Sequence, residues 1–319
     1  MKILIVGKRA SITHWLEDCA AAWRADGHEV RVAATRDPRL HASIEAVLLA
    51  KRLGAPLAVA IARRARRFSP DLIVAIGAYH VPAQVLEHLA ALPRRAPIVG
   101  WVGDRFSRAA EPAAALLDAV AYTDSGLVAL HGAFGFAAPA RFLPHAVDPH
   151  AARPAAESAE RQDRLVFVAN PTDHRRQVVS QISAPISLYG PGWTTFPLVE
   201  HRIVARRVAP GDLRPLYGRH LAALNIRNEH NVLAGLNQRN FDPYLAWTPV
   251  VTDDQEDLGR CFEEGREVLV YRDVAELNDI HARLRREPAE ATRVGHAGRA
   301  RVLAEHTYAR RLDGLIKAL

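Results

Sequence analysis

The sequence predicts an α/β protein built from two doubly wound halves, each a parallel sheet covered by helices. Two observations support this. Short apolar runs that suit buried parallel strands alternate with amphipathic helical stretches along the chain. The alternation stops once, in a stretch rich in alanine and charge, and then starts again. Open parallel sheets bind ligands beyond the carboxyl ends of their strands, so the loops there are expected to hold the chemistry.

The first half begins with a strand, loop, helix and strand. Residues 2–6 form an apolar run, and residues 15–26 have the spacing of an amphipathic helix that ends at Gly27. Residues 29–34 form the next strand, which completes a βαβ unit. Further strands are expected at 71–77, 97–102, 119–123 and 140–143, and helices at 82–92, 113–117 and 128–134.

Residues 150–163 have no strand pattern, and we interpret them as an interdomain linker. Strands are then expected at 165–169, 185–189, 204–208, 221–226, 248–252 and 267–271, and helices at 175–182, 212–219, 274–284 and 289–319, the last with a break near His306. We therefore predict an N-terminal Rossmann-like domain at 1–152, a second domain at 164–304, and a C-terminal helix at 305–319 that packs back on the first domain.

Composition narrows the class of protein. Hydrophobic residues make up 49% of the 319 residues, which is enough for a core and excludes global disorder. Cys19 and Cys261 lie far apart without metal-ligand spacing, which fits a reducing cytoplasm. No apolar run suits a signal peptide or a membrane span, so we expect a cytoplasmic protein. The net charge of +7 indicates either contact with phosphates or the bias of a GC-rich genome.

Several common motifs are missing from the sequence. It has no GxGxxG fingerprint, GxxxxGK[ST] loop, GxSxG elbow or HExxH pair, which argues against a dehydrogenase, a P-loop ATPase, a common α/β-hydrolase and a zincin. It also lacks an aromatic-rich RNA motif and a helix-turn-helix signature, so we expect no nucleic-acid partner.

The densest polar segment is residues 224–253, which starts and ends in an apolar strand. It carries the polar residues Arg227, Asn228, Glu229, His230, Asn237, Gln238, Arg239 and Asp242. Buried polar groups need partners, and a ligand with ribose hydroxyls and phosphates would supply them. Asp242 before Pro243 suits a helix start, which can itself seat a phosphate. The alternative is that Asp242 only caps a helix and Arg239 only pairs locally.

Four segments of the second half carry a family resemblance. They are GLNQR at 235–239 followed by Phe241, SLYGPGW at 187–193, EVLVYRD at 267–273 and GRARVLAEHTY at 298–308. They resemble the CgeB-like glycosyltransferases, a bacterial group related to glycosyltransferase family four, and the resemblance spans about 165–311. The first half is similar only at PIVGWVGD (97–104) and FLPHAVD (142–148).

The resemblance implies the GT-B fold, in which two Rossmann-like domains face a central cleft, here with 1–152 as the acceptor-side domain and 164–304 as the nucleotide-sugar donor domain. It implies a hexosyltransferase-type enzyme that moves a sugar from a nucleotide-diphosphate-sugar donor to an acceptor. The acceptor is left open among a glycan, a lipid-linked sugar, a protein and a small molecule. No cofactor or metal ion is expected, because such enzymes stabilise the leaving diphosphate with arginines and a helix N-terminus. We interpret Asp253-Asp254, the nearest acidic pair, as ordinary loop acidity.

The resemblance also assigns roles by position. Asp242, where glutamate is usual, would hold the donor ribose hydroxyls, and Arg175 and Arg239 would face the diphosphate. The full set predicted to bind the donor is Arg175, Tyr189, Gly190, Trp193, Tyr217, Arg227, Asn237, Arg239 and Asp242.

Two positions depart from the resembled pattern. A second glutamate of the relatives is Ala234 here, so a sugar contact would have to come from Glu229, His230 or Asn231. The relatives' glycine after the helix is Trp247, which does not easily adopt a positive φ, so we expect a different helix end.

Asp104, which follows a predicted buried strand, is the first candidate for a catalytic residue. In an inverting reaction it would accept the proton of the acceptor hydroxyl, and in a retaining reaction it would position acceptor or sugar. His14 in the first loop is the second candidate. For each residue the alternative is a structural role.

Residues 40–68 combine apolar stretches with arginines. They indicate either a peripheral contact with the inner face of a membrane or a helix pair with a solvated basic end. Two other functions stay open: a nucleotide-sugar epimerase of the same fold, and a non-catalytic two-domain binding protein.

Overall fold

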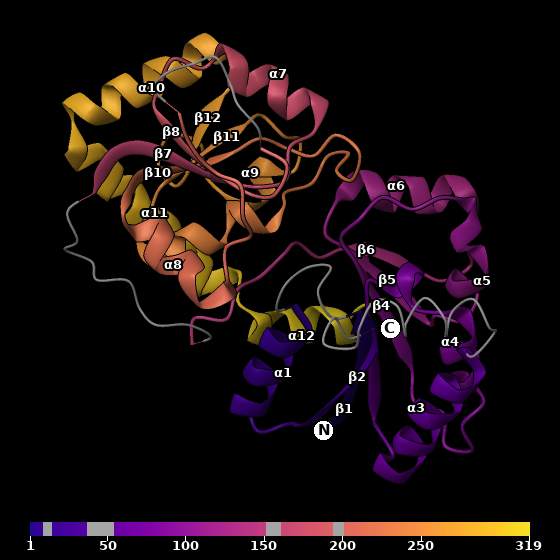
Figure 1. Ribbon diagram of the computed structural model, residues 1–319. Coiled ribbons are helices and arrows are strands. Elements are labelled where there is room, and N and C mark those ends of the chain that lie inside the picture. The colour runs from indigo at the N-terminus through magenta and orange to yellow at the C-terminus, as the bar shows by residue number, and fades with distance from the viewer. Residues whose placement is uncertain (9–14, 37–53, 151–160, 194–200) are drawn as a thin grey trace. The chain divides into compact units, whose positions relative to one another are not determined.

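The computed structural model describes residues 1–8, 15–36, 54–150, 161–193 and 201–319 (Figure 1). Its contacts divide the chain into two units, Met1–Leu143 with Tyr308–Leu319, and Pro144–Thr307. The division falls at Leu143, before the predicted linker at 150–163, most of which lies outside the described residues. The C-terminal helix belongs to the first unit.

The first unit is a six-stranded parallel sheet in the order β2-β1-β3-β4-β5-β6. Its strands are β1 (Lys2–Lys8), β2 (Glu29–Arg36), β3 (Leu72–Ile76), β4 (Ile98–Val102), β5 (Ala119–Tyr122) and β6 (Ala140–Phe142). Its helices are α1 (Trp15–Ala25), α3 (Gly54–Phe68), α4 (Ala83–Ala90), α5 (Glu111–Ala114), α6 (Ser125–Phe134) and α12 (Tyr308–Ile316), with 3₁₀ turns η1 (Ala78–His80) and η2 (Arg108–Ala110).

The last helix completes the core of this unit. The indole of Trp23 donates a hydrogen bond to the carbonyl of Tyr308 at 2.8 Å. The Tyr308 ring lies against Trp101 of the central strand β4, with centroids 6.1 Å apart. All five residues of β3 and of β4 are buried, as their continuous apolar runs predict.

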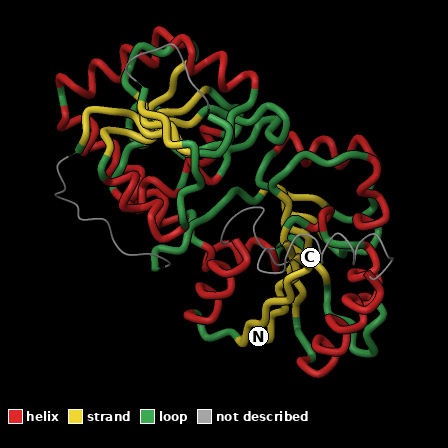
Figure 2. Tube along the Cα trace, viewed as in Figure 1, coloured by secondary structure: helices red, strands yellow, loops and turns green. Residues whose placement is uncertain are grey.

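The second unit is also a six-stranded parallel sheet, in the order β12-β11-β10-β7-β8-β9. Strands are yellow and helices red in Figure 2. Its strands are β7 (Gln162–Val168), β8 (Ile186–Tyr189), β9 (Arg202–Val204), β10 (His220–Asn225), β11 (Val250–Asp253) and β12 (Leu269–Tyr271). Its helices are α7 (Asp173–Gln181), α8 (Pro210–Gly218), α9 (Leu258–Cys261), α10 (Val274–Arg286) and α11 (Pro288–Glu305), with 3₁₀ turns η3 (Gln238–Asn240) and η4 (Asp242–Ala246).

Each sheet has a point where the direction of strand addition reverses. In the first sheet it lies between β1 and β3, and in the second between β7 and β10. Ligands of open α/β sheets bind in the crevice at the carboxyl ends of the strands beside this point. The fold therefore marks the end of β1 in one unit, and the ends of β7 and β10 in the other, as candidate sites.

Most elements confirm the prediction within a few residues, and two places differ. The strand predicted at 204–208 lies at Arg202–Val204. The helix expected to begin at Asp242 is the short 3₁₀ turn η4, preceded by Phe241, and the Asp242 side chain does not cap it. Capping occurs one turn earlier, where Asn237 and Asn240 form a reciprocal capping box around η3.

The expectation for Trp247 was wrong, because this residue does adopt the left-handed conformation, with φ 53° and ψ 23°. Its surroundings hold it there. Its carbonyl accepts a hydrogen bond from Arg161 at 2.7 Å, and the Arg299 guanidinium lies 4.5 Å from its ring centroid. Gly295 of α11 packs so closely that a Cβ there would lie 2.2 Å from the Trp247 carbonyl oxygen. The end of the segment that carries Asp242 is thus fixed by packing on α11.

Candidate functional site

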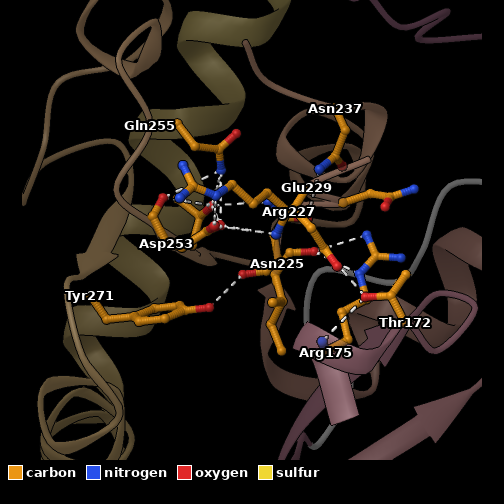
Figure 3. Close-up of polar contacts among 12 residues, drawn as sticks. Thr172, Arg175, Asn225, Arg227, Glu229, Asn237, Asp253, Gln255 and Tyr271 are labelled. Atoms are coloured by element: carbon orange, nitrogen blue, oxygen red, sulfur yellow. Dashed lines mark hydrogen bonds and ion pairs between the residues drawn. The ribbon is translucent and has the colours of Figure 1, made fainter. Parts of the chain in front are cut away.

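Polar side chains gather where neighbouring strands of the second sheet end (Figure 3). Asn225 is the last residue of β10, Asp253 the last of β11 and Tyr271 the last of β12. Because these strands are parallel, their carboxyl ends share one edge of the sheet, and the Tyr271 hydroxyl donates a hydrogen bond to the Asn225 carbonyl at 3.1 Å. Arg175, in the first turn of α7 after β7, joins them.

Arg175 is 3% exposed, which is unusual for an arginine. Thr172 caps α7, and its hydroxyl accepts from the Arg175 amide at 3.3 Å. The guanidinium donates from Nε and Nη2 to the Ile226 carbonyl at 3.1 and 2.9 Å, and from Nη1 to the Asn170 carbonyl at 3.0 Å. Within the described residues its hydrogen-bond acceptors are therefore carbonyl oxygens, and its positive charge is not neutralised by direct pairing with a carboxylate.

Arg239 is the second cation of this edge, and it too is held by a neutral group. Its Nε donates to the side-chain oxygen of Asn225 at 3.2 Å. The guanidinium carbons of Arg175 and Arg239 lie 5.5 and 6.0 Å from the centroid of the same Phe167 ring. Burial, and next the charge of Arg239, lower the pKa of Arg175 to about 9. Two neighbouring cations whose hydrogen-bond partners are uncharged can bind an anion that has more than one negative charge.

Acidic groups lie around these arginines. Asp253 accepts hydrogen bonds from the Arg227 amide at 3.2 and 3.3 Å and pairs with the Arg227 Nε at 3.6 Å, and burial raises its pKa. Glu229 accepts a hydrogen bond from the Thr172 hydroxyl at 3.3 Å, and its other oxygen lies 3.5 Å from His230 Nε2. Ala234 is buried, with 4% exposure. Of the three residues proposed to replace a contact at Ala234, Glu229 therefore lies at the arginine cluster (Figure 3).

Asp242 is a partly buried carboxylate close to the second arginine. Gln238 donates to its Oδ1 at 2.8 Å, and the charges of Arg214 and Arg239 lie nearby. Burial outweighs these favourable contacts and raises the pKa of Asp242 to about 6. Burial, and next the charge of Asp242, raise the pKa of Tyr217 as well. A carboxylate kept where its ionised form is disfavoured is typical of a functional site.

The other predicted donor-binding residues have mixed positions. Gly190, at φ 149°, follows Tyr189 at the end of β8, and a Cβ there would lie 2.2 Å from the Ala169 carbonyl oxygen. Trp193 is only 1% exposed, and its indole donates to that same carbonyl at 2.7 Å. The structure thus places the Trp193 side chain in the core, where it supports the loop rather than facing a ligand. Arg227 is 42% exposed at its side chain, and Asn237 caps η3.

The predicted donor-binding set leaves out several residues of this edge, of which Asn225 is the clearest. Thr172, Gln238, Arg214 and Gln255 also contribute side chains to it. A signal was present for Asn225, because it is the one amide at the end of an apolar strand, HLAALN.

The carboxyl edge of the first sheet holds Asp104. A cavity there is lined by Lys8, Trp15, Leu16, Ile76, Gly77, His80, Val102, Gly103 and Asp104. Asp104 Oδ2 lies 3.9 Å from His80 Nε2, and His80 is a residue that the sequence did not single out. The other catalytic candidate, His14, lies outside the described residues.

A metal site in the described part of the chain would need several ligating side chains close together. There, no three His, Cys, Asp or Glu side chains are grouped so as to hold a metal ion. Asp253 binds the Arg227 amide, and Asp254 pairs with Arg272 at 3.6 Å.

Asp242→Asn provides a test of the buried carboxylate. Between about pH 4 and pH 6 the native wild type binds a proton that the unfolded chain releases, so this group lowers stability as the pH rises through that window and has a constant effect above it. The variant should therefore be more stable than the wild type by about 1–2 kcal/mol at pH 8, and equal to it at pH 4. Urea unfolding at both pH values measures this.

Asp212→Asn, at an exposed position of α8, is the matched control and should show no such difference. If Asp242→Asn were less stable than the wild type at pH 8, the carboxylate would stabilise the fold and the burial argument would be wrong.

Comparison with protein families gives one match. Residues 167–317, just under half of the chain, match the family described as glycosyl transferase-like. The matched segment includes Arg175, Asn225, Arg239 and Asp242. The comparison with curated proteins found no match.

Solved structures show the same fold at low sequence identity. HepE of Anabaena in complex with UDP-glucose superposes over 100% of both chains, with a TM-score of 0.67 and 14% identity. Sucrose-phosphate synthase of Thermosynechococcus elongatus has a TM-score of 0.70 and 14% identity, covering 99% of this chain and 98% of its own. AviGT4, a glycosyltransferase involved in avilamycin A biosynthesis, has a TM-score of 0.62 and 16% identity, covering 99% and 97%. The chain therefore has the two-domain, Rossmann-like GT-B fold, and its second unit is similar to the glycosyl transferase-like family.

Proposed function

We propose that this protein is a glycosyltransferase that moves a sugar from a nucleotide-diphosphate-sugar donor to an acceptor. The observation that carries the proposal is the pair Arg175 and Arg239, held by neutral groups at the switch point of the second sheet. The family match covers this edge. Structures of the same fold were solved with UDP and with UDP-glucose, which supports a donor of this class.

The geometry suggests how the donor is held. The two guanidinium groups and the N-terminus of α7 would stabilise the diphosphate, whose negative charge grows as the bond to the sugar breaks. Asp242 would accept hydrogen bonds from the ribose hydroxyls, because an ionised carboxylate is a strong acceptor. Cations already in place can stabilise the leaving group directly, so we propose that the reaction needs no metal ion.

The motifs support a finer assignment. Residues 235–239, 187–193, 267–273 and 298–308 resemble the CgeB-like enzymes related to family four, and all four segments lie within the matched residues 167–317. We propose membership of that group and a hexose as the transferred sugar.

On the acceptor side, we propose that Asp104 acts at the cavity it shares with Lys8 and His80. As a base it would remove the proton of the acceptor hydroxyl in an inverting reaction, and in a retaining reaction it would orient that hydroxyl. The anomeric configuration of the product decides between the two roles.

A nucleotide thermal-shift screen tests the proposed function. UDP, GDP or their sugar conjugates should raise the melting temperature of the wild type by mass action. Arg175→Gln and Asp242→Ala should each weaken the affinity for the best nucleotide about 10- to 100-fold, since each removes a charge-assisted contact worth about 1.5–3 kcal/mol. Arg219→Ala, at an exposed position of the same unit, is the matched control and should keep the full shift.

Absence of a shift with every nucleotide would contradict the proposal. Turnover of the donor into a second nucleotide sugar without any acceptor would instead establish an epimerase. Tight binding without turnover in the presence of an acceptor would establish a binding protein.

We also propose a peripheral contact between α3 and an anionic membrane surface. Arg63, Arg64, Arg66 and Arg67 are all exposed on this helix, and Leu57 near its start is 37% exposed. Basic residues near an anionic bilayer each add about 1 kcal/mol of attraction. Among the described residues, no helix has the length and apolar character needed to cross a bilayer.

Vesicle sedimentation tests the membrane contact. The wild type should bind vesicles that contain anionic phospholipid, and not neutral ones, with an affinity that falls as salt rises. Changing the four α3 arginines to glutamine should reduce binding at least tenfold. The same change at Arg202, Arg206, Arg207 and Arg219, four exposed arginines of the second unit, should leave it unaltered. An equal loss in both variants would show that net charge alone is responsible.

A further inference from the structure

The side chain of Asn225 is fully buried, with 0% exposure, at the end of β10. Its Oδ1 accepts from Asn237 Nδ2 at 2.9 Å and from Arg239 Nε at 3.2 Å. Its Nδ2 donates to Asn240 Oδ1 at 3.3 Å and to Thr252 Oγ1 at 3.0 Å. All four hydrogen-bonding positions of the amide are therefore occupied.

The neighbours of Asn225 fix which way its amide points. The backbone N–H of Asn237 donates to Asn240 Oδ1 at 3.2 Å, so that atom of Asn240 must be the acceptor oxygen. The Asn225 atom facing Asn240 Oδ1 must then be the NH₂ donor, and the remaining atom, the oxygen, faces Arg239. The reversed amide would place an NH₂ group against the N–H of Arg239. The network therefore specifies an oxygen, without a charge, as the partner of Arg239.

The absence of charge at this position matters because an arginine that is partly buried, as Arg239 is, ordinarily pairs with a carboxylate. An aspartate would have the same shape as Asn225 and would accept the same hydrogen bond from Arg239, while neutralising the guanidinium. Asparagine orients the guanidinium and leaves its charge available. Among the described residues this is the single hydrogen bond of the Arg239 side chain, so its two NH₂ groups keep their donors for a ligand.

We propose that Asn225 is a positioning residue that aims Arg239 at a diphosphate and keeps that arginine out of a direct ion pair with a carboxylate. The proposal rests on the proposed function only for the nature of the complete ligand, because inorganic pyrophosphate carries the same chemistry. Asn225 itself touches no ligand, and its effect passes through Arg239.

A double-mutant cycle tests this. We would measure the dissociation constants of pyrophosphate, UDP and uridine by calorimetry for the wild type, Asn225→Asp, Arg239→Gln and the double variant. Asn225→Asp should weaken pyrophosphate and UDP about 10- to 100-fold, and uridine less than about threefold, because only the phosphates meet the neutralised cation. In the Arg239→Gln background, Asn225→Asp should cause little further loss.

Asn278→Asp is the matched control, because it makes the same charge change in the same unit. Asn278 accepts from the Ser183 and Ala184 amides at 3.1 Å before β8 begins, away from the carboxyl edge, and its substitution should alter none of the three constants. Asn225→Ser removes the hydrogen bond that orients Arg239 without adding a charge, and it should weaken the affinity for UDP about 3- to 10-fold. This variant provides the test if the aspartate variant does not fold.

The outcomes separate this proposal from the proposed function. An equal loss for uridine and UDP, or an undiminished loss in the Arg239→Gln background, would overturn the role of Asn225. If the wild type bound pyrophosphate but no nucleotide, the proposed function would be overturned, and the double-mutant cycle with pyrophosphate would still test the role of Asn225. If neither pyrophosphate nor UDP bound the wild type, both proposals would fail.

Discussion

The second unit depends on two arginine side chains held close together by groups without charge. Arg175 is fixed by backbone carbonyls that follow β7 and β10, and Arg239 by the amide of Asn225. Two such cations repel each other and lose hydration on burial, so the arrangement lowers the stability of the fold. An anion that accepts hydrogen bonds from their remaining N–H groups would offset both the charge repulsion and the lost hydration. For this reason we connect this edge of the sheet with a diphosphate.

Two further residues at this edge are held in energetically unfavourable states by the packing around them. Asp242 is kept where burial raises its pKa to about 6, and Trp247 is kept at a positive φ by Gly295 and Arg161. Non-glycine residues in this conformation persist only where their surroundings determine them. The two sit at opposite ends of the short η4 turn, so α11 fixes the turn that presents the carboxylate.

Much of the fold follows from the sequence because strand burial and helix periodicity are local signals. The apolar runs of β3 and β4 predict fully buried central strands, and the strand at 165–169 corresponds to β7. The arrangement of the polar edge is less predictable, because it depends on contacts between distant residues. Asn225 at the end of β10 meets Asn237 before η3 and Thr252 of β11 only once these elements are packed together. For Trp193 the local signal was misleading. Its motif indicates a ligand contact, but Gly190 packs closely on Ala169 and the Trp193 indole donates to the Ala169 carbonyl, so the ring lies in the core.

A crystal structure of this protein in complex with UDP would most directly test the central claim, that Arg175 and Arg239 bind a diphosphate. The account predicts phosphate oxygens within about 2.7–2.9 Å of guanidinium nitrogens of both Arg175 and Arg239, with the ribose hydroxyls at Asp242 and the Arg239–Asn225 hydrogen bond intact. A nucleotide whose phosphates lie away from both arginines would contradict it.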